Sequence, residues 1–436
     1  MTSQKDTLKE SLMNKSLNYH GQGKPGKLTI IPSKPCTTAD ELSLAYTPGV
    51  AFPCLKIQKN PDDAYKYTNK GNLVAVISNG TAVLGLGNIG PLAGKPVMEG
   101  KSVLFKRFAG IDSIDLEINE TDPKKLVQII SSLAISFGGI NLEDIKAPEC
   151  FYVETESQKR ANIPIFHDDQ HGTSIIASAA LLNALEITKK NIANVKIVFS
   201  GAGAAALSVA KLFIKLGANI ENIFMVDSEG VITRDRLSHV NEHKKPFARQ
   251  TTSKTLKEII VGADVFVGLS QPNVLTVEDI QRMNTYPIIF AMANPNPEIS
   301  YEMAKSAVSE IIFATGRSDY PNQVNNVLGF PFLFRAALDT RAGVINIEMK
   351  LAAVKALAAL AKKKVPKEVI SAYGREFSFG PEYIIPKPFD PRVLSEVTPK
   401  IAQAAMDSGI AQKKIDLKEY SKSLKKLGKQ LAKGKF

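Results

Sequence analysis

Two pairs of neighbouring carboxylates are the residues of this chain best suited to hold a metal ion. Glu143-Asp144 lies in GINLEDIKAPE, and Asp168-Asp169 lies in IPIFHDDQHGT, directly after an apolar, strand-like run. Adjacent acids beside apolar strands are costly to bury without a cation. Several carboxylate oxygens at one point suit a hard divalent ion such as Mg²⁺ or Mn²⁺. Histidines flank the second pair, so a softer metal stays open, as does the structural alternative of helix capping or surface acids.

Tyr46 and Lys101 are candidates for acid–base chemistry. Tyr46 lies in LSLAYTPGVA, where Pro48-Gly49 predicts a turn, and Lys101 lies in MEGKSVLFK, at the predicted start of a strand. A lysine that enters an apolar strand is a candidate for a lowered pKa and a general-base role. Taken alone, each of these residues is more often structural.

Two glycine motifs resemble dinucleotide-binding signatures, and their contexts differ. GLGNIG (85–90) is followed by Pro91, Gly94, Pro96 and Gly100, which make a poor helix, so we expect its glycines to serve turns and close backbone approach. GAGAAA (201–206) follows the strand-like VKIVFS and opens a clean helix. Strand, glycine-rich turn and helix form the Rossmann arrangement, in which the helix amino terminus stabilises a pyrophosphate. The predicted cofactor contacts are Gly201, Ala202, Gly203, Ala204, Ala205, Ala206 and Asp227.

The cofactor is NAD or NADP, and the residues near Asp227 leave the choice open. An acid at the end of the second Rossmann strand usually bonds the ribose 2′-hydroxyl and favours NAD. Ser228 follows it, however, and basic residues that would accommodate a 2′-phosphate follow at Arg234, Arg236, Lys244 and Lys245.

The elements that must position these residues divide near residue 170. Before that point, short strand-like runs alternate with glycine and proline, and they predict strands at 72–78, 82–87, 102–108 and 113–118, with a helix at 123–136. After it, a helix is expected at 174–185. Apolar strands then alternate with polar or helical sequence, at 195–201, 222–227, 263–270, 286–294 and 310–316, before a helix at 347–363.

Continuous apolar strands separated by helices imply a parallel sheet covered on both faces. We therefore predict an α/β protein of two domains, a smaller N-terminal α/β domain (1–165) and a C-terminal Rossmann-type, doubly wound parallel sheet (166–405). A lysine-rich C-terminal tail (406–436) follows.

Composition narrows the class of protein. The 436 residues are 44% hydrophobic and 22% charged, which is ordinary for a soluble globular protein. No apolar run is long enough to cross a bilayer, and the amino terminus does not resemble a secretory signal. Three scattered cysteines argue against a disulfide framework or a structural zinc site. We therefore expect a cytoplasmic protein with no membrane partner. The net charge is +12, and the last 26 residues account for +7 of it. We interpret that tail as an amphipathic helix or a solubilising end, and disfavour nucleic-acid binding.

Eight motifs in one order resemble the malic enzymes, most closely the shorter bacterial form. They are LAYTPGVA, SNGTAVLGLGNIG, EGKSVLFKRFAGID, EDI, FHDDQHGT, GAGAAA, AMANPNPE and YPNQVNNVLGFP, and the resemblance runs from about residue 17 to about residue 410. It implies metal-dependent oxidation and decarboxylation of malate to pyruvate with NAD or NADP. It also implies a homodimer or larger homo-oligomer.

Carried over by position, the resemblance assigns roles to the candidates. Tyr46 and Lys101 match the catalytic tyrosine and lysine, and Asp168 matches an aspartate that supports the lysine. The metal ligands fall on Glu143, Asp144 and Asp169, and asparagines that contact substrate and nicotinamide fall on Asn294 and Asn326.

Two positions depart from the family pattern. Phe52 stands where the bacterial motif usually has glutamate, which removes a carboxylate beside the Tyr46 turn, and Ala82 stands where the animal enzymes have a malate-binding arginine. The phosphotransacetylase-like extension of some bacterial relatives is expected to be absent. Two alternatives stay open: malolactic conversion of malate to lactate, and a non-catalytic dinucleotide-binding regulator.

Overall fold

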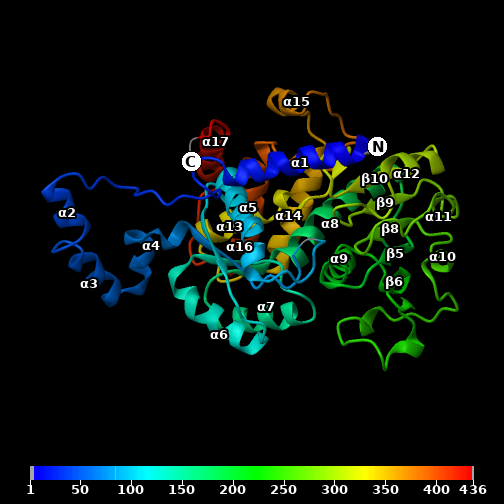
Figure 1. The fold of residues 1–436 in the computed structure, drawn as a ribbon, viewed down its shortest axis with the longest axis horizontal. Helices are drawn as coiled ribbons and strands as arrows, with labels where there is room; N and C mark the ends of the chain where they lie inside the picture. The colour runs from blue at the N-terminus through cyan, green and yellow to red at the C-terminus, as the bar shows by residue number, and fades with distance from the viewer. Residues whose placement is uncertain (1–3, 84, 435–436) are drawn as a thin grey trace.

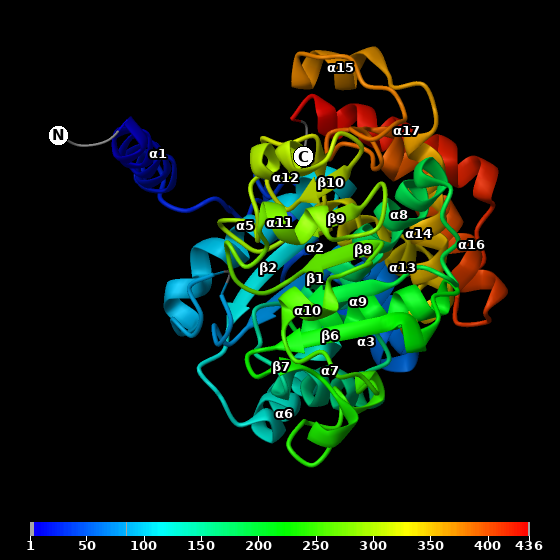
Figure 2. The ribbon, with the colours of Figure 1, turned by 90° about the vertical axis from the view of Figure 1, so that its right-hand side faces the viewer.

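Two β-sheets, one in each half of the chain, carry the helices and loops that hold the candidate residues. Strands of the second sheet are labelled in Figure 1, and strands of the first sheet are labelled in Figure 2. The computed structural model describes residues 4–83 and 85–434. Leu84, within the predicted strand 82–87, lies outside the described residues. The described part of that stretch is a turn closed by one antiparallel bridge between Val83 and Gly87, so the prediction of a strand there was wrong.

The first sheet has the order β2-β1-β3-β4, and all its strands run parallel. Its strands are β1 (Leu73–Ser78), β2 (Asp112–Glu117), β3 (Gly139–Leu142) and β4 (Ile165–His167). The predicted strands 72–78 and 113–118 are confirmed as β1 and β2. Because neighbouring parallel strands end at the same edge, Glu143 after β3 and Asp168 after β4 are brought to one side of this sheet.

Helix α5 (Pro91–Ala109) corrects two predictions, because the stretch after GLGNIG was expected to be a poor helix and 102–108 to be a strand. Pro91 occupies the first helical turn, where its missing N–H costs nothing, and Gly110 ends the helix in the left-handed conformation. The helix buries Met98 and Phe105 against the core. Tertiary burial thus overrides the low helix propensity of the internal glycines and Pro96.

Helices α6 (Pro123–Leu133) and α7 (Glu149–Arg160) complete the first domain. Asp122 caps α6 by accepting hydrogen bonds from the Lys124 and Lys125 N–H groups. A 3₁₀ turn (Ala134–Ser136) extends it. The predicted helix 123–136 is confirmed by these two elements.

The second sheet has the order β11-β10-β9-β8-β5-β6-β7, with only the β6–β7 pair antiparallel. Its strands are β5 (Ile197–Ser200), β6 (Ile223–Asp227), β7 (Gly230–Val231), β8 (Val265–Gly268), β9 (Ile288–Ala291), β10 (Ile312–Thr315) and β11 (Asn322–Gln323). All five strands predicted for this half are confirmed. The chain moves outward from β5 to β6 and then returns to β8 on the other side of β5. This reversal is the topological switch point at which such sheets bind ligands.

A long buried helix joins the two sheets. Helix α8 (Asp168–Thr188) starts directly after β4 and leads towards β5, and it contains the predicted helix 174–185. Helices α9 (Ala204–Lys215), α10 (Leu256–Ile259), α11 (Val277–Gln281) and α12 (Tyr301–Ala307) accompany the second sheet. Helix α8 therefore connects the last strand of the first sheet with the first strand of the second.

The last helices pack on α5, on α8 and on one another. They are α13 (Phe330–Thr340), α14 (Ile347–Ala361), α15 (Lys367–Tyr373), a π-helical turn η8 (Val393–Val397), α16 (Thr398–Asp407) and α17 (Leu417–Ala432). Helix α14 confirms the predicted helix 347–363. The Phe105 ring of α5 meets the Phe330 and Phe334 rings of α13 edge-on, with centroids 4.8 and 5.2 Å apart. A Cβ on Gly139 would lie 3.0 Å from the Phe334 ring, so this glycine permits the close packing of α13 on β3.

The lysine-rich tail is a packed helix, as one of the two interpretations expected. Leu424 and Leu431 of α17 are buried, and Leu427 lies against Gly110 at the end of α5. Its lysines are mostly on the outer face.

The N-terminal arm, defined here as residues 4–59, projects from the rest of the molecule at residues 39–59 in Figure 1 and at residues 4–21 in Figure 2. Between these two parts it is fixed to α5, because the Lys27 N–H donates to Glu99 Oε2 at 2.9 Å and Lys27 Nζ donates to the Pro96 carbonyl oxygen at 2.6 Å. It contains α1 (Gln4–Gly21), α2 (Ala39–Ala45) and α3 (Ala51–Lys59), and α4 (Ala64–Tyr67) follows. From residue 10 onward it exposes many large apolar side chains: Leu12, Met13, Leu17, Tyr19, Ile30, Ile31, Leu42, Leu44, Tyr46, Phe52 and Leu55. No helix within residues 4–83 and 85–434 has the length and apolar character to cross a membrane.

Candidate active site

Lys101 lies in the middle of α5, buried, with its ammonium held by two carboxylates. Its Nζ lies 2.6 Å from Asp168 Oδ2, 2.7 Å from Glu143 Oε1 and 4.4 Å from the centre of the Phe330 ring. Burial alone would lower the pKa of Lys101, but Asp168, Glu143 and Asp169 outweigh it and raise that pKa above its ordinary value. The predicted position at the start of a strand was wrong, because Lys101 lies inside α5. The expected lowering of its pKa was also wrong, because the neighbouring carboxylates outweigh burial.

The three predicted metal ligands converge beside this lysine. Glu143 and Asp144 follow β3, and Asp169 lies in the first turn of α8; one carboxylate oxygen from each lies within 4.8 Å of the others. The Asp144 N–H donates to Asp169 Oδ2 at 2.8 Å. Asp144 adopts a φ of 55°, in the left-handed region that non-glycine residues rarely occupy. Strained backbone of this kind is concentrated at functional sites.

The electrostatics of the cluster favour a cation. Burial is the main cause that raises the pKa of Glu143 and of Asp168 to about 7, although Lys101 acts in the opposite direction on both. With Asp144 and Asp169, the cluster holds four acids and one lysine, so full ionisation leaves excess negative charge at a largely buried site. Asp169 keeps 38% of its side chain exposed, which opens the cluster to solvent on that side. A hard divalent ion fits this set of oxygen donors.

Gly172 and Asn326 complete the surroundings of Asp168. Asn326, in the 3₁₀ turn Asn326–Leu328, donates from Nδ2 to Asp168 Oδ2. A Cβ on Gly172 would lie 2.0 Å from Asp168 Oδ1 and 2.8 Å from Asn326 Cβ, so only glycine fits there. The structure thus brings Asn326 into contact with the group that holds Lys101.

A buried glutamate that sequence reasoning missed supports the same loop. Glu154 of α7 accepts hydrogen bonds from the His167 N–H at 3.0 Å and from His171 Nε2 at 3.0 Å. Its pKa is lowered to about 2, because His171 and neighbouring positive charge outweigh the effect of burial. No local pattern marks Glu154, since its partners lie on β4 and α8. Neither histidine belongs to the group of possible metal ligands found among residues 4–83 and 85–434, so the softer metal finds no support.

The predicted dinucleotide loop has the expected geometry. Gly201 adopts a φ of 108°, and a Cβ there would lie 2.4 Å from the Leu269 carbonyl oxygen. Gly203 precedes the first residue of α9, no side chain caps that helix, and a Cβ on Gly203 would meet nothing within 4 Å. Free backbone N–H groups at an open helix amino terminus suit a pyrophosphate. Ala206 is buried at the start of α9.

The GLGNIG motif of the first domain lies against the loop that follows β9. A Cβ on Gly85 would lie 2.6 Å from the Asn294 carbonyl oxygen, so this glycine serves close backbone approach, as expected of GLGNIG. Asn294 follows β9 and is exposed, and its loop thereby lies against the first domain.

Asp227 at the end of β6 is already paired with two cations. Arg236 Nη2 donates to Asp227 Oδ1 at 2.9 Å, and Lys244 Nζ donates to Oδ2 at 3.0 Å. These hydrogen bonds outweigh burial and lower the pKa of Asp227. Of the four basic residues considered for a 2′-phosphate, these two lie at Asp227, whereas Arg234 is exposed and Lys245 pairs with Glu242.

Tyr46 is a predicted catalytic residue that the structure does not bring to Lys101 and the carboxylate cluster. It ends α2 in the N-terminal arm, and 69% of it is exposed, whereas Lys101 is 7% exposed. Figure 1 shows α2 and α3 at the far left, away from α5 and α8. Within one chain, the lysine and the tyrosine do not share a site.

Family models match both halves of the chain. The model described as malic enzyme, N-terminal domain, matches residues 25–158. The model described as malic enzyme, NAD binding domain, matches residues 170–372.

Relatives and solved structures extend this similarity. The chain is 57% identical to the NADP-dependent malic enzyme of Salmonella typhimurium over 93% of its own length, and it spans about half of that relative, 54%. It is 55% identical to the NADP-dependent malic enzyme of Halomonas elongata, over 91% of the chain and 94% of the relative. The crystal structure of malic enzyme from Pyrococcus horikoshii superposes with a TM-score of 0.88 at 39% identity, covering 97% of each chain.

We predict that Mn²⁺ stabilises the fold through this cluster in a pH-dependent way. The folded pKa values of Glu143 and Asp168 exceed their unfolded values of about 4. Without added Mn²⁺, the protonated carboxyl groups of Glu143 and Asp168 therefore stabilise the fold below about pH 4. This contribution to the free energy of unfolding is lost as the pH rises through 7. Mn²⁺ should raise the thermal unfolding midpoint clearly at pH 7.5 and less at pH 5.5, where protons compete.

Differential scanning calorimetry measures both midpoints. Asp169→Asn should remove most of the shift, because it removes one ligand charge, whereas Asp407→Asn, on an exposed residue of α16, should keep it. A full shift in Asp169→Asn, or equal shifts at the two pH values, would contradict the assignment.

Proposed function

Because the chain belongs to the malic enzyme family, we propose that it oxidises and decarboxylates malate to pyruvate and carbon dioxide with reduction of a nicotinamide cofactor. The observation that carries this proposal is the buried Lys101, which pairs with Asp168 and Glu143. Glu143 also converges with Asp144 and Asp169 on one point. Such a site offers a proton acceptor next to a place for a divalent cation. The dinucleotide loop of the second domain supplies a place for the hydride acceptor.

In the oxidation of malate, Lys101 would take the proton of the C2 hydroxyl, and a nicotinamide bound at the dinucleotide loop would supply the acceptor for the C2 hydride. Asp168 positions the amine, and Asn326 fixes Asp168. Burial is the largest influence on the Lys101 pKa and lowers it; the opposing carboxylates dominate only while their charge is uncompensated. The neutral amine that the step requires is therefore favoured once a cation offsets that charge.

Glu143, Asp144 and Asp169 are the residues that would hold Mg²⁺ or Mn²⁺. When bound there, the ion polarises the C2 carbonyl and stabilises the negative charge that develops as carbon dioxide leaves. Asn294 and Asn326 are placed by this proposal against the nicotinamide and the substrate.

We assign the protonation of C3 to Tyr46 and infer that Tyr46 acts in the site of a second copy of the chain. Its own chain holds it on an exposed arm, with Leu42, Leu44 and Phe52 around it also exposed. Exposed apolar side chains in such numbers indicate an interface. A twofold dimer that exchanges arms buries them and completes two sites at once.

Exposed apolar residues at the start of the helix that carries Lys101 offer a surface for the partner's arm. Leu86 lies in the turn before α5 and Leu92 in its first turn, and they are 67% and 82% exposed. Phe52, which replaces the usual glutamate, adds to the apolar character of the arm. In this proposal Phe52 is a subunit contact.

We propose NADP as the preferred cofactor. Asp227 is neutralised by Arg236 and Lys244, so a ribose 2′-phosphate meets two cations rather than a free carboxylate. NAD would meet an acid whose oxygens are already engaged. The geometry around Asp227 thus supports the NADP alternative left open by the sequence.

The activity is tested by a paired absorbance assay. With malate and Mn²⁺, we expect NADP reduction with equimolar pyruvate, and no reduction in Lys101→Ala, because the proton acceptor is lost. Lactate without net reduction would support malolactic conversion instead. No turnover, with Mn²⁺ and NADP both shown to bind, would support the regulator.

Exchange of Tyr46 between subunits predicts complementation between two inactive variants. Tyr46→Phe and Lys101→Ala homodimers each lack one group in every site. Hybrid dimers have one site with both groups, so random subunit exchange at equal amounts should restore about a quarter of wild-type activity. Activity is measured before and after the two proteins are unfolded and refolded together.

The control is Lys101→Ala mixed with Asp168→Asn, whose lesions lie in the same site of one subunit. Hybrids of these two variants have no intact site and should stay inactive. Absence of recovery in the Tyr46→Phe mixture, with hybrids demonstrated by native mass spectrometry, would place Tyr46 in its own chain's site.

Cofactor choice is tested by removing the two cations at Asp227. The double variant Arg236→Gln, Lys244→Gln should lower kcat/KM for NADP by about tenfold or more, since a charged hydrogen bond contributes roughly 1.5–3 kcal/mol. The value for NAD should change far less. Arg234→Gln is the matched control, and equal losses for both cofactors in the double variant would refute the assignment.

A further inference from the structure

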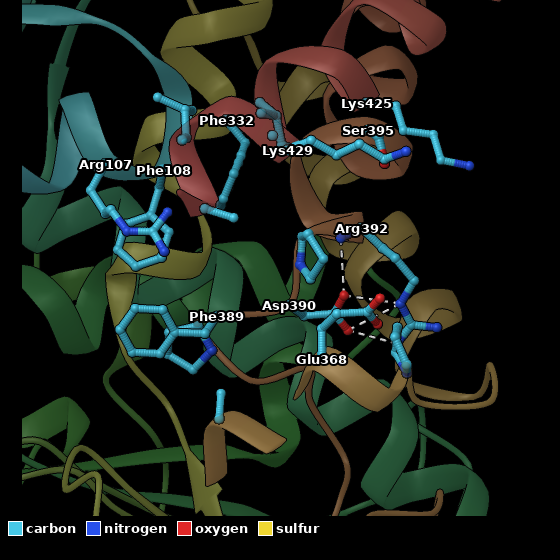
Figure 3. Close-up of a pocket in the computed structure, with 18 residues that line it drawn as sticks. Arg107, Phe108, Phe332, Glu368, Phe389, Asp390, Arg392, Ser395, Lys425 and Lys429 are labelled. Atoms are coloured by element: carbon cyan, nitrogen blue, oxygen red, sulfur yellow. Dashed lines mark hydrogen bonds and ion pairs between the residues drawn. The ribbon is translucent and has the colours of Figure 1, made fainter. Parts of the chain in front are cut away.

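A polar cluster joins α7, α8 and α9 through hydrogen bonds, and no step of the proposed reaction uses it. We call it the Glu154 cluster, and its members are Glu154, His167, Gln170, His171 and Ser208. None of them lines the cavity of about 580 Å³ that lies between α5 and α17 (Figure 3). Glu154 and His167 are buried, so the cluster is a packed joint between elements.

Glu154 is surrounded by hydrogen-bond donors. Its oxygens accept from the His167 N–H at 3.0 Å, from Gln170 Nε2 at 3.3 Å and from His171 Nε2 at 3.0 Å. An ionised carboxylate can accept all of these bonds, because it has two oxygens and no donor of its own. The three donors flank the two aspartates at the start of α8 on both sides. One side chain of α7 thus holds both ends of the turn that carries the proposed metal ligand Asp169.

This support comes from outside the helix because α8 has no side-chain cap of its own. The residue at the N-cap position, His167, makes no capping hydrogen bond with its side chain. The two acids of the first turn are engaged elsewhere. The Asp168 carboxylate bonds to Lys101, and the Asp169 carboxylate accepts from the N–H of residue 144. The start of α8 is therefore held in place from α7.

His171 extends the cluster to the dinucleotide helix. Its Nδ1 lies 3.4 Å from Ser208 Oγ on α9, whereas its Nε2 faces Glu154. A neutral imidazole donates from one ring nitrogen and accepts at the other, so the Ser208 hydroxyl donates to Nδ1 when Nε2 carries the proton. Ser208 lies four residues after Ala204, the first residue of α9, which is about 6 Å along the helix. A chain of hydrogen bonds thus runs from α7, through the start of α8, to α9.

The relative placement of α8 and α9 matters for the proposed reaction. Malate would be oxidised beside Lys101 and the carboxylates, and the loop before α9 offers the place for the hydride acceptor. Reacting groups need a near-attack distance, and a displacement of about 1 Å can lower the rate about a hundredfold. Helices α8 and α9 pack directly on each other. Contacts that fix the first turn of α8 against α9 therefore influence the rate without touching the substrate.

We propose that Glu154 and His171 are positioning residues, which together with Ser208 hold the first turn of α8, and Asp169 with it, in a fixed place against α9. This inference rests on the proposed function, because it names the residues that set the metal site and the dinucleotide site relative to each other. Loss of the Glu154 carboxylate weakens metal binding, since Asp169 is no longer held. Loss of the Ser208 hydroxyl leaves the metal ligands in place and slows hydride transfer.

The first test is Mn²⁺ binding to the folded, full-length protein, measured by electron paramagnetic resonance well below the thermal unfolding midpoint. Glu154→Ala should raise the Kd for Mn²⁺ about 10- to 100-fold, the usual effect of removing a group that orients a metal ligand. Glu154→Gln should give a smaller rise, because the amide keeps the shape and one acceptor but turns hydrogens towards other donors. Glu156→Gln, on the same helix and paired with Lys159, is the control and should bind Mn²⁺ as the wild type does.

The second test is kinetic and concerns the contact with α9. Ser208→Ala should keep the wild-type Kd for Mn²⁺ but lower kcat several-fold, with little change in KM for malate or NADP. The isotope effect on kcat with malate deuterated at C2 should rise, because hydride transfer then limits the rate more strongly. Ser208→Thr keeps the hydroxyl and should restore kcat.

An unchanged Kd for Mn²⁺ in a folded Glu154→Ala protein would overturn the inference, even if that variant unfolds at a lower temperature. If Glu154→Ala does not fold, the same result in Glu154→Gln would overturn it. An unchanged isotope effect in Ser208→Ala would refute the link to α9.

The Mn²⁺ measurement does not depend on turnover, so the two proposals can fail separately. Weaker Mn²⁺ binding in Glu154→Ala, with no malate oxidation by the wild type, would reject the proposed function alone. Malate oxidation by the wild type, with an unchanged Kd for Mn²⁺ in Glu154→Ala, would reject the positioning role alone.

Discussion

The ammonium of Lys101, buried between carboxylates, is the constraint on which the rest of the structure depends. A lysine shielded from water is tolerated only when its charge is paired and hydrogen-bonded. The partners, Asp168 and Glu143, follow neighbouring strands of one parallel sheet, so their approach requires β3 and β4 in register. Helix α5 then has to lie over that edge, and α13 holds it there through Phe105 and Phe330. The C-terminal helices therefore belong to the site although they contribute few reactive groups.

The same constraint explains why the site suits a cation. One lysine does not balance Glu143, Asp144, Asp168 and Asp169. Burial is the main cause that raises the pKa values of Glu143 and Asp168, and neighbouring acids raise them further, so ionising the whole cluster is costly. Apolar side chains at these positions would carry no such electrostatic cost. The presence of four acids therefore indicates a role in chemistry rather than in stability. Glu154, held by His167 and His171, keeps the first turn of α8 in place without adding charge to the cluster.

The sequence predicted the second sheet well and the surroundings of Lys101 poorly, for a physical reason. Buried parallel strands are continuous apolar runs, so β5, β6, β8, β9 and β10 were recognisable from local pattern. Helix α5 was not, because its glycines and prolines oppose a helix that only tertiary burial stabilises. The sign of the Lys101 pKa shift depends on acids 42 and 67 residues away along the chain. Tyr46 lies exposed on the N-terminal arm, away from Lys101, and no local pattern predicts that placement. Spacing identified which residues could act, but not which of them one chain brings together.

The central claim is that Glu143, Asp144 and Asp169 hold the divalent ion beside Lys101. Anomalous X-ray scattering at the manganese edge, from crystals of the protein soaked in Mn²⁺, tests it most directly. The account predicts one strong peak per chain, about 2.0–2.5 Å from an oxygen of each of the three carboxylates. A peak held by His167 or His171, or no ordered peak at saturating Mn²⁺, would contradict it.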